Sequence, residues 1–311
     1  MPPSRISRRT FVIAGGVAAL AAACSSSDDD ESAPAITSPT LGQSDMPIQG
    51  GAAAGDLFAA AEVRFPFGVL RSSEDGQELV IGEPVTIGFR GPGGETIPPM
   101  TATFRGAGLD TGQQHEHPDG VSHVHDFERK GIYVVHTTFP VAGVWTADLD
   151  VAGQPGEFAF EVFPEPLAPM AGDPAPRAAS PTAADPLGVD PICTRDPACP
   201  LHEVSLDQAI AKGTPTVVMF STPTRCQSRW CGPVLELLLD AREGYLDKAT
   251  FVHVEIYRDL QSPDLVPTLE AWGLQSEPWL YAIDGQGTVV NRLEGAFDLD
   301  EITSLLDTLT T

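Results

Sequence analysis

The hydrophobic pattern divides the chain into two segments of different kind. Between residues 57 and 163, short apolar runs are broken by Gly and Pro at intervals of roughly 8–15 residues, as in strands joined by turns. From Trp145 to Val151 apolar and polar residues alternate, which predicts a strand with one buried face. The first segment is therefore predicted to be all-β, with about six or seven strands.

Between residues 192 and 311 the pattern alternates between strands and helices. Residues 214–222, TPTVVMFST, form a continuous apolar run of the kind found in strands buried on both faces. Ser205 and Asp298 stand where they would cap helices. The pattern predicts helices over 205–213, 233–244, 264–273 and 298–309, and strands over 214–222, 250–257, 278–284 and 287–295.

Two further stretches have the composition of linkers. Residues 24–56 are mostly Ser, acidic residues, Pro and Gly, which predicts a disordered tether. Residues 164–191 are dense in proline, which predicts a stiff, extended spacer. The expected folded domains are therefore 57–163 and 192–311.

The first residues have the features of an export signal. Residues 7–12, SRRTFV, resemble the twin-arginine signature, and the apolar run that follows is shorter than the roughly 20 residues that span a bilayer. Residues 20–24, LAAAC, resemble a bacterial lipobox. This resemblance implies removal of residues 1–23 and a lipid on Cys24, which would anchor the protein to the outer face of the cytoplasmic membrane. Ordinary signal cleavage or an uncut anchor is the alternative.

The charge excludes one class of partner. The chain has 43 acidic and 18 basic residues, a formal net charge of -25. Nucleic acids and anionic membrane surfaces repel such a protein, so we expect no nucleic-acid partner.

The segment 136–153, HTTFPVAGVWTADLDVAG, resembles the closing hairpin of immunoglobulin-like domains of the bacterial envelope. This resemblance, with the strand pattern, implies an Ig-like β-sandwich for residues 57–163. The expected fold class is thus a multi-domain chain, an all-β Ig-like sandwich followed by an α/β domain.

The α/β segment, residues 202–311, resembles the thioredoxin family in three features. Cysteines follow the first core strand, Gly232-Pro233 opens the next helix, and Glu277-Pro278 precedes the hairpin strand. The resemblance implies a thioredoxin-like fold, a cis peptide bond before Pro278, and a role for this proline in seating a partner strand.

The stretch 225–234, RCQSRWCGPV, departs from the family pattern because Val234 stands where thioredoxin has its second cysteine. Cys226 lies five residues before Cys231 instead. At a helix N-terminus, with Arg225 and Arg229 beside them, these thiols are expected to ionise readily. We favour Cys226 as nucleophile and Cys231 as resolving thiol, the reverse assignment being the alternative.

The remaining cysteines, Cys193 and Cys199, lie in proline-rich sequence before the domain. In an exported chain, four cysteines allow three disulfide connectivities, and the short loops favour 193 with 199 and 226 with 231. The first pair is expected to be a structural clip. A second dithiol, or a metal site joined by His202, is the alternative. His202 is otherwise expected at the surface, and His253 packed within its strand.

Four of the seven histidines fall close together, at His115, His117, His123 and His125. If the segment folds at Pro118–Gly120, the two pairs approach each other, an arrangement suited to Zn²⁺ or Cu²⁺. A solvated hairpin tip is the alternative.

The function expected from the sequence is thiol–disulfide exchange with exported proteins that carry thiols or disulfides. The alternatives are a redox-inactive binding or scaffold lipoprotein, and a metal-handling lipoprotein that uses the histidine cluster.

Overall fold

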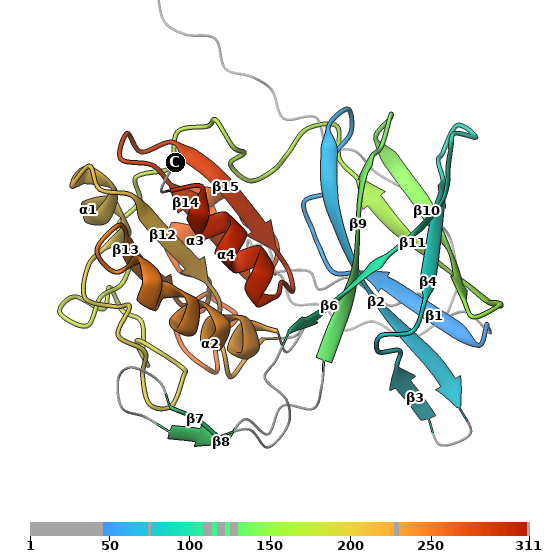
Figure 1. Ribbon diagram of the computed structural model, residues 1–311. Coiled ribbons are helices and arrows are strands. Elements are labelled where there is room, and N and C mark those ends of the chain that lie inside the picture. The colour runs from blue at the N-terminus through green and yellow to red at the C-terminus, as the bar shows by residue number, and fades with distance from the viewer. Residues whose placement is uncertain are drawn as a thin grey trace, which may run out of the picture. The chain divides into compact units, whose positions relative to one another are not determined.

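The computed structural model describes residues 46–73, 76–107, 114–116, 122–124, 130–226 and 230–309 (Figure 1). Residues 1–23 and Cys24 lie outside these ranges, as do His117, His125 and Arg229. Within the described ranges, no helix combines the length and the apolar character needed to cross a membrane.

The described part of residues 46–163 is built on one mixed sheet of nine strands. Its order is β5-β4-β10-β11-β1-β2-β9-β6, with β3 paired to β2. β1 pairs in parallel with β11 and antiparallel with β2, so it joins both groups of strands into a single curled sheet. The strands are β1 (Ile48–Ala52), β2 (Glu62–Ser73), β3 (Gly76–Leu79), β4 (Val85–Arg90), β5 (Thr96–Thr101), β6 (Thr103–Ala107), β9 (Lys130–Thr138), β10 (Gly143–Val151) and β11 (Gln154–Val162).

Aromatic side chains fill the interior of this sheet. The Phe65 ring lies 4.8 Å from that of Phe160 and 5.1 Å from that of Phe89, and Phe139 contacts Trp145 at 5.1 Å between ring centroids. The alternation predicted for residues 145–151 is confirmed, because Trp145, Ala147, Leu149 and Val151 are buried and the polar residues between them are not. The sheet curls around this cluster, which removes the largest side chains from water.

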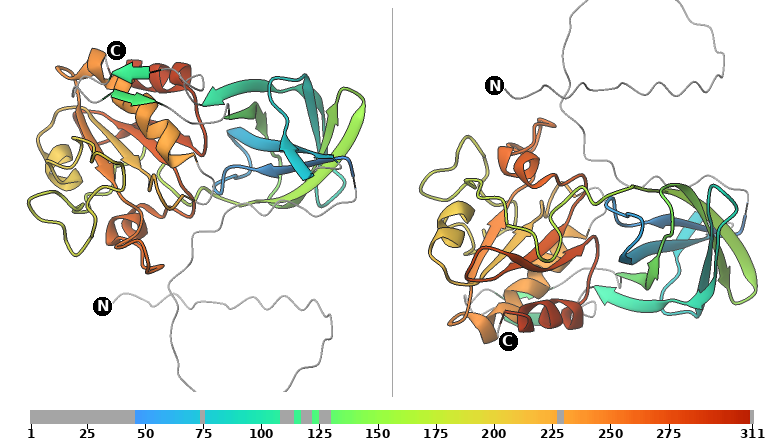
Figure 2. Two further views of the ribbon diagram at one scale, coloured as in Figure 1. Left: turned by 90° about the horizontal axis from the view of Figure 1, so that it is seen from below. Right: turned by 90° about the horizontal axis from the view of Figure 1, so that it is seen from above.

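The second part is a four-stranded sheet of order β13-β12-β14-β15, in which β12 is parallel to β13 and antiparallel to β14. Alternate residues of β12 face two different cores. Val217 and Met219 pack with α2 and α4, whereas Val218 and Phe220 pack with α1 and α3. Figure 2 shows α2 and α4 on one side of this sheet and α3 on the other. The elements are α1 (Leu206–Ala211), β12 (Thr216–Phe220), α2 (Cys231–Ala241), a 3-10 turn (Arg242–Tyr245), β13 (Thr250–Val254), α3 (Pro267–Trp272), β14 (Trp279–Ile283), β15 (Val289–Glu294) and α4 (Leu299–Asp307).

Local sequence explains where two of these helices begin. Pro267 opens α3 at a position where its missing N–H costs nothing, and Gly273, with φ 66°, ends it. The Asp298 carboxylate accepts from the Glu301 amide, and Glu301 bonds back in a capping box that opens α4. Ser205 precedes α1 but does not cap it, because its hydroxyl oxygen accepts from the Ser180 amide at 2.8 Å instead of from a helix amide, while its proton goes to Asp207.

The structure contradicts the predicted fold class. It is mostly β, with 40% strand and 15% helix, and is neither a two-sheet sandwich nor clearly an α/β fold of the thioredoxin type. The sandwich prediction fails because β1 bridges β11 and β2, so the strands of this part form one sheet. The α/β prediction fails because the helices are few and short: α1 and α3 have 6 residues each.

The predicted linkers are also more ordered than expected. Residues 48–52, assigned to the tether, form β1, and Asp56 is buried. In the predicted spacer, Ala168, Ala175 and Val189 are buried in the same core as α1 and α3. Small apolar side chains between the prolines therefore hold this segment against the four-stranded sheet.

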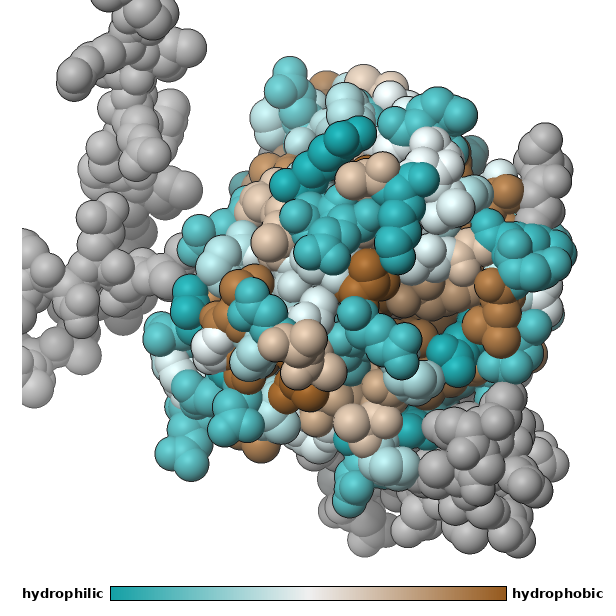
Figure 3. All heavy atoms as spheres, turned by 90° about the vertical axis from the view of Figure 1, so that its left-hand side faces the viewer, coloured by the Kyte–Doolittle hydropathy of each residue, from teal (hydrophilic) through white to brown (hydrophobic). Residues whose placement is uncertain are grey.

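The surface is mixed in polarity. Figure 3 shows hydrophobic residues in small groups between hydrophilic ones, the usual arrangement of a water-exposed face. Among the described residues, the exposed large apolar side chains are Ile81, Val141, Val144, Leu167, Leu187, Leu246, Leu260 and Leu299.

Candidate functional site

The predicted dithiol lies between the end of β12 and the start of α2. Cys226 is half-buried in the connecting loop, and Cys231 is the first residue of the helix and is fully buried. The Cys231 amide donates to the Cys226 sulfur at 3.4 Å. Neither residue forms a disulfide in the structure.

Glu277 is the third member of this cluster. Its Oε2 accepts a hydrogen bond from the Cys231 thiol at 3.4 Å, and the two sulfurs and the carboxylate lie within 4.8 Å of one another. The peptide bond from Glu277 to Pro278 is cis, as predicted, and β14 begins at the next residue. The sequence had indicated Pro278 here but not the carboxylate beside it.

The electrostatics of the two thiols differ. Burial raises the pKa of the Cys231 thiol well above its usual value, and the nearby Cys226 and Glu277 raise it further. Cys231 therefore keeps its proton while the half-exposed Cys226 meets solvent. This asymmetry matches the order in which Cys226 attacks first.

Arg225, which was predicted to stabilise the thiolate, also has a structural role. The Arg225 guanidinium donates to the backbone carbonyls of Asp259, at 3.0 Å, and Ser262, and it lies 4.2 Å from the centre of the Tyr257 ring. It thus fastens the Cys226 loop to residues 257–262. Arg229 falls outside the described residues.

A second cluster adds His253 to Cys193, Cys199 and His202, which the sequence had offered as an alternative metal site. Cys193 and Cys199 come from the irregular segment before α1, His202 follows three residues later, and His253 comes from the middle of β13. All four are buried, and their ligand atoms lie within 4.8 Å of one another. These residues are close enough to bind a metal ion.

The structure departs from two expectations for this cluster and confirms one. The predicted Cys193–Cys199 disulfide is not formed, and both residues are free thiols. His202 is buried rather than at the surface. His253 is packed in its strand, as predicted, but its Nδ1 lies 3.4 Å from the Cys199 sulfur and 3.1 Å from His202 Nε2.

Hydrogen bonding between the thiols of Cys193 and Cys199 shifts their pKa values in opposite directions. Interaction with Cys199 lowers the pKa of Cys193, and the pKa of Cys199 is raised by the same interaction. The spacing Cys-x5-Cys-x2-His was visible in the sequence, but His253 lies 51 residues beyond His202. Tertiary packing brings this fourth residue in: the His253 amide of β13 donates to the carbonyl of Leu201, next to His202, at 2.9 Å.

The histidine cluster is described only in part. His115 in β7 (Gln114–Glu116) stands opposite His123 in β8 (Ser122–Val124) in an antiparallel ladder. His117 and His125 lie outside the described residues.

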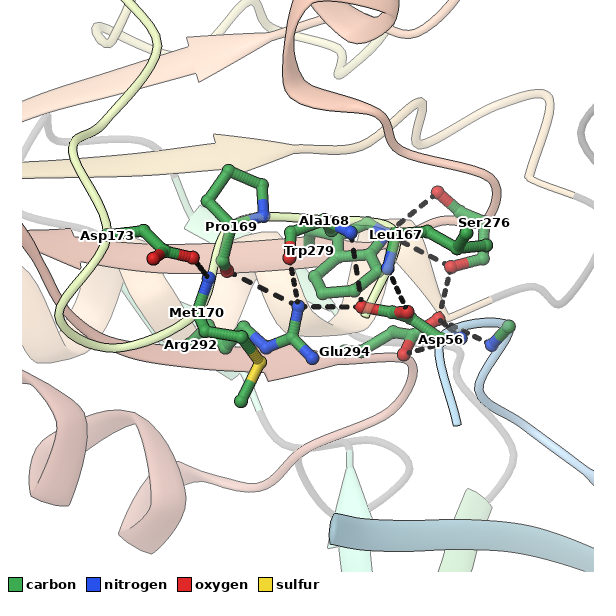
Figure 4. A network of polar contacts seen from close by, with 11 residues as sticks. Asp56, Leu167, Ala168, Pro169, Met170, Asp173, Ser276, Trp279, Arg292 and Glu294 are labelled. Carbon is green, nitrogen blue, oxygen red and sulfur yellow. Dashed lines mark hydrogen bonds and ion pairs between the residues drawn. The ribbon is translucent and has the colours of Figure 1, made fainter. Parts of the chain in front are cut away.

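A third polar cluster links the segment before β2 to β15 (Figure 4). Arg292 donates to the buried Asp56 carboxylate at 2.8 Å, and Asp56 accepts from the Leu167 amide at 2.7 Å. The Glu294 carboxylate accepts from the Gly55 amide at 2.5 Å. Burial raises the pKa of Glu294 to about 7. These residues border a cavity of about 200 Å³.

The chain was compared with protein-family models and with curated proteins, and neither comparison found a match. The functional argument therefore depends on the geometry of these clusters.

Proposed function

We propose that the protein catalyses thiol–disulfide exchange through Cys226 and Cys231. The observation that carries the proposal is the asymmetric pair itself: a half-exposed sulfur beside a buried, protonated thiol that donates to a carboxylate. A structural staple needs no neighbouring proton acceptor, whereas an exchange site does.

The residues support a balanced reaction. The Cys226 thiolate attacks a disulfide of the partner protein, which forms a mixed disulfide and releases one partner thiolate. Cys231 then attacks the Cys226 sulfur, so the Cys226–Cys231 disulfide forms and the second partner thiolate leaves. The partner disulfide is reduced, and the cysteine pair is oxidised.

Glu277 supplies the general base for the second step. Because burial keeps Cys231 protonated, this thiol must lose its proton before it can attack. Glu277 Oε2 lies 3.4 Å from the Cys231 sulfur, within reach of that proton. The carboxylate thereby gives this proton an acceptor inside the buried site, and the proton transfer leaves Glu277 neutral beside the new thiolate.

We further propose that this chemistry takes place outside the cytoplasm, with the chain held at the membrane by a lipid on Cys24. The partners would be other exported proteins that contain thiols or disulfides. The sequence of residues 7–24 supports this location.

Metal handling at the histidine cluster is a second candidate function. The supporting observation is the backbone register that sets His115 opposite His123. The Zn²⁺ or Cu²⁺ that the sequence predicts there would be bound between the two short strands.

The test of the exchange function is a redox titration of the chain without residues 1–23. Free thiols are alkylated at each potential, and Cys226 and Cys231 are followed by peptide mass spectrometry. We expect reversible opening between about -120 and -270 mV, the range of known exchange proteins. A midpoint below about -300 mV would identify a structural disulfide and a binding module instead.

The matched variant is Cys231→Ser, which should trap partner proteins on Cys226 as mixed disulfides. Cys226→Ser should trap none, because the remaining thiol is buried. Equal trapping by both variants would reverse the assigned order of attack.

A further inference from the structure

We propose that Cys193, Cys199, His202 and His253 form a closed zinc centre. This site is made of other residues than the exchange site proposed at Cys226, and the zinc proposal does not rest on the exchange function. Two thiols and two imidazoles in a buried, four-ligand arrangement are the donor set of structural zinc sites.

The distances between the donor atoms match a tetrahedron. With Zn–S near 2.3 Å and Zn–N near 2.0–2.1 Å, sulfur and nitrogen ligands should be about 3.5 Å apart and two nitrogens about 3.3 Å apart. Three of the four sulfur–nitrogen distances are 3.3, 3.4 and 3.9 Å, the two histidine nitrogens are separated by 3.1 Å, and all four ligand atoms lie within 4.8 Å of one another. These separations leave room for one ion in contact with the four atoms.

The hydrogen bonds of His253 leave the required nitrogen available. Nε2 lies 3.0 Å from the carbonyl oxygen of Ser221, which can only accept, so in the neutral ring Nε2 carries the proton. Nδ1 is then unprotonated, and its lone pair faces Cys193, Cys199 and His202. Without a metal, only one of these neighbours could donate a hydrogen bond to that lone pair. A cation at the centre would instead be coordinated by all four ligand atoms.

The surroundings supply the outer contacts of a metal ligand set. A backbone carbonyl that accepts from the distal nitrogen of a ligating histidine fixes the tautomer and the ring orientation, and Ser221 does this for His253. The Cys199 amide donates to the Cys193 sulfur at 3.4 Å, which favours its thiolate. Two thiolates would neutralise Zn²⁺, so the buried centre carries no net charge.

The donor set favours zinc over copper and assigns the ion a structural role. All four positions are filled by protein atoms, which leaves no open position for substrate. Cu²⁺ prefers tetragonal geometry, whereas Zn²⁺ accepts a tetrahedron of sulfur and nitrogen.

The centre would fasten the cysteine segment to the sheet. Between the two cysteines, the Thr194 amide donates to Glu255 at 2.6 Å, and Arg195 Nε donates to Glu236 of α2 at 2.8 Å. The Thr194 hydroxyl also accepts from the Thr224 amide, two residues before Cys226. Zinc would thus hold the segment that supports the loop of the exchange site.

The test uses the chain without residues 1–23 and without substitutions. This protein is purified under reducing conditions and dialysed against Zn²⁺. We expect about one tightly bound zinc per chain, and X-ray absorption showing two sulfur ligands near 2.3 Å and two nitrogen ligands near 2.0–2.1 Å. Cobalt substitution should give the intense visible bands of tetrahedral thiolate coordination. Absence of bound zinc, or a ligand set without sulfur, would overturn the proposal.

Variants then distinguish this centre from the other metal-capable groups. Cys193→Ser and His253→Asn should each lower zinc affinity by at least about tenfold, in line with loss of a ligand. The double variants Cys226→Ser/Cys231→Ser and His115→Asn/His123→Asn should keep the zinc. His136→Asn, at an exposed position, is the matched control.

The opposite pattern, loss of zinc in either double variant with retention in the single ones, would place the metal elsewhere. The chain recovered after export must also be examined without added reductant. Alkylation should then find Cys193 and Cys199 unpaired and protected by metal until a chelator is added. A Cys193–Cys199 disulfide in that sample would also overturn the proposal.

Discussion

The buried carboxylate of Glu294 should make the stability of this protein depend on pH in a direction opposite to that of most acidic groups. Its pKa is raised from 4.5 to about 7, chiefly by burial. Between pH 4.5 and about pH 7, the folded protein therefore keeps a proton on Glu294 that the unfolded chain has already lost. Stability should fall as pH rises through this window, and the loss should be complete above about pH 7.

The size of the effect follows from the shift. Each unit corresponds to 1.36 kcal/mol, so ionisation of Glu294 should cost about 3 kcal/mol of folding free energy. About 2.5 kcal/mol of this falls between about pH 5 and pH 8. The groups that face Glu294 are the Gly55 and Asp56 amides, the Ser276 hydroxyl and the charges of Asp56 and Arg292.

The perturbation is Glu294→Gln, which keeps a hydrogen-bond acceptor but cannot ionise. Urea unfolding of both proteins, followed by tryptophan fluorescence from about pH 5 to pH 8, gives the difference in unfolding free energy at each pH. Other carboxylates cancel in this difference because they titrate in both proteins. With an m value of about 3 kcal/mol per molar, the midpoint of the unmodified protein should fall relative to the variant by about 0.8 M.

The control is Glu161→Gln, the same chemical change at an exposed position in β11. The difference in unfolding free energy between this variant and the unmodified protein should stay constant over the same pH range. If the Glu294→Gln difference is also constant within about 0.5 kcal/mol, then Glu294 does not hold a proton in the folded state and the argument from burial is wrong.

Further outcomes follow from single contacts. Glu277→Gln should slow resolution of the mixed disulfide by about 100-fold while leaving the first attack unchanged, as measured by quenched-flow alkylation; equal rates would remove the base from the mechanism. In the reduced protein, Cys226 should react with iodoacetamide faster than Cys231, and equal labelling in native buffer would contradict the burial of the second thiol. Leu238→Ala should cost about 2–5 kcal/mol in urea unfolding because this side chain is fully buried, and a loss under 1 kcal/mol would show that the core closes around it. Asp298→Ala should cost about 1 kcal/mol through loss of the capping box, whereas Asp298→Asn should keep most of that stability.

Local pattern predicted most of the secondary structure of residues 205–309. The run TPTVVMFST forms β12, the helix after the cysteines forms, and Asp298 caps α4 as expected. These predictions succeed because hydrophobic period and capping chemistry act within a few residues. Ser205 shows the limit: its hydroxyl oxygen accepts from the amide of Ser180, far away in the chain, so a good capping residue does not cap.

The sequence pattern did not predict which strands pair when they lie far apart in the chain. β1 arises in a segment with the composition of a tether, and it forms because β2 and β11 offer it partners on both sides. This one strand turns the expected two-sheet sandwich into a single curled sheet. Composition records how much apolar surface a segment can bury by itself, but not the backbone partners that the rest of the chain provides.

For the sites, the sequence by itself determined which residues carry chemistry, and the tertiary structure decided which of them meet. Cys226 and Cys231 could be paired in advance because they are neighbours in the chain. Glu277 joins them only through β14, and His253 reaches Cys193 and Cys199 only because the segment that carries them lies against β13, where the His253 amide donates to the Leu201 carbonyl. Proximity between residues 50 or more positions apart is set by packing and strand register, and these depend on the whole fold rather than on any local pattern.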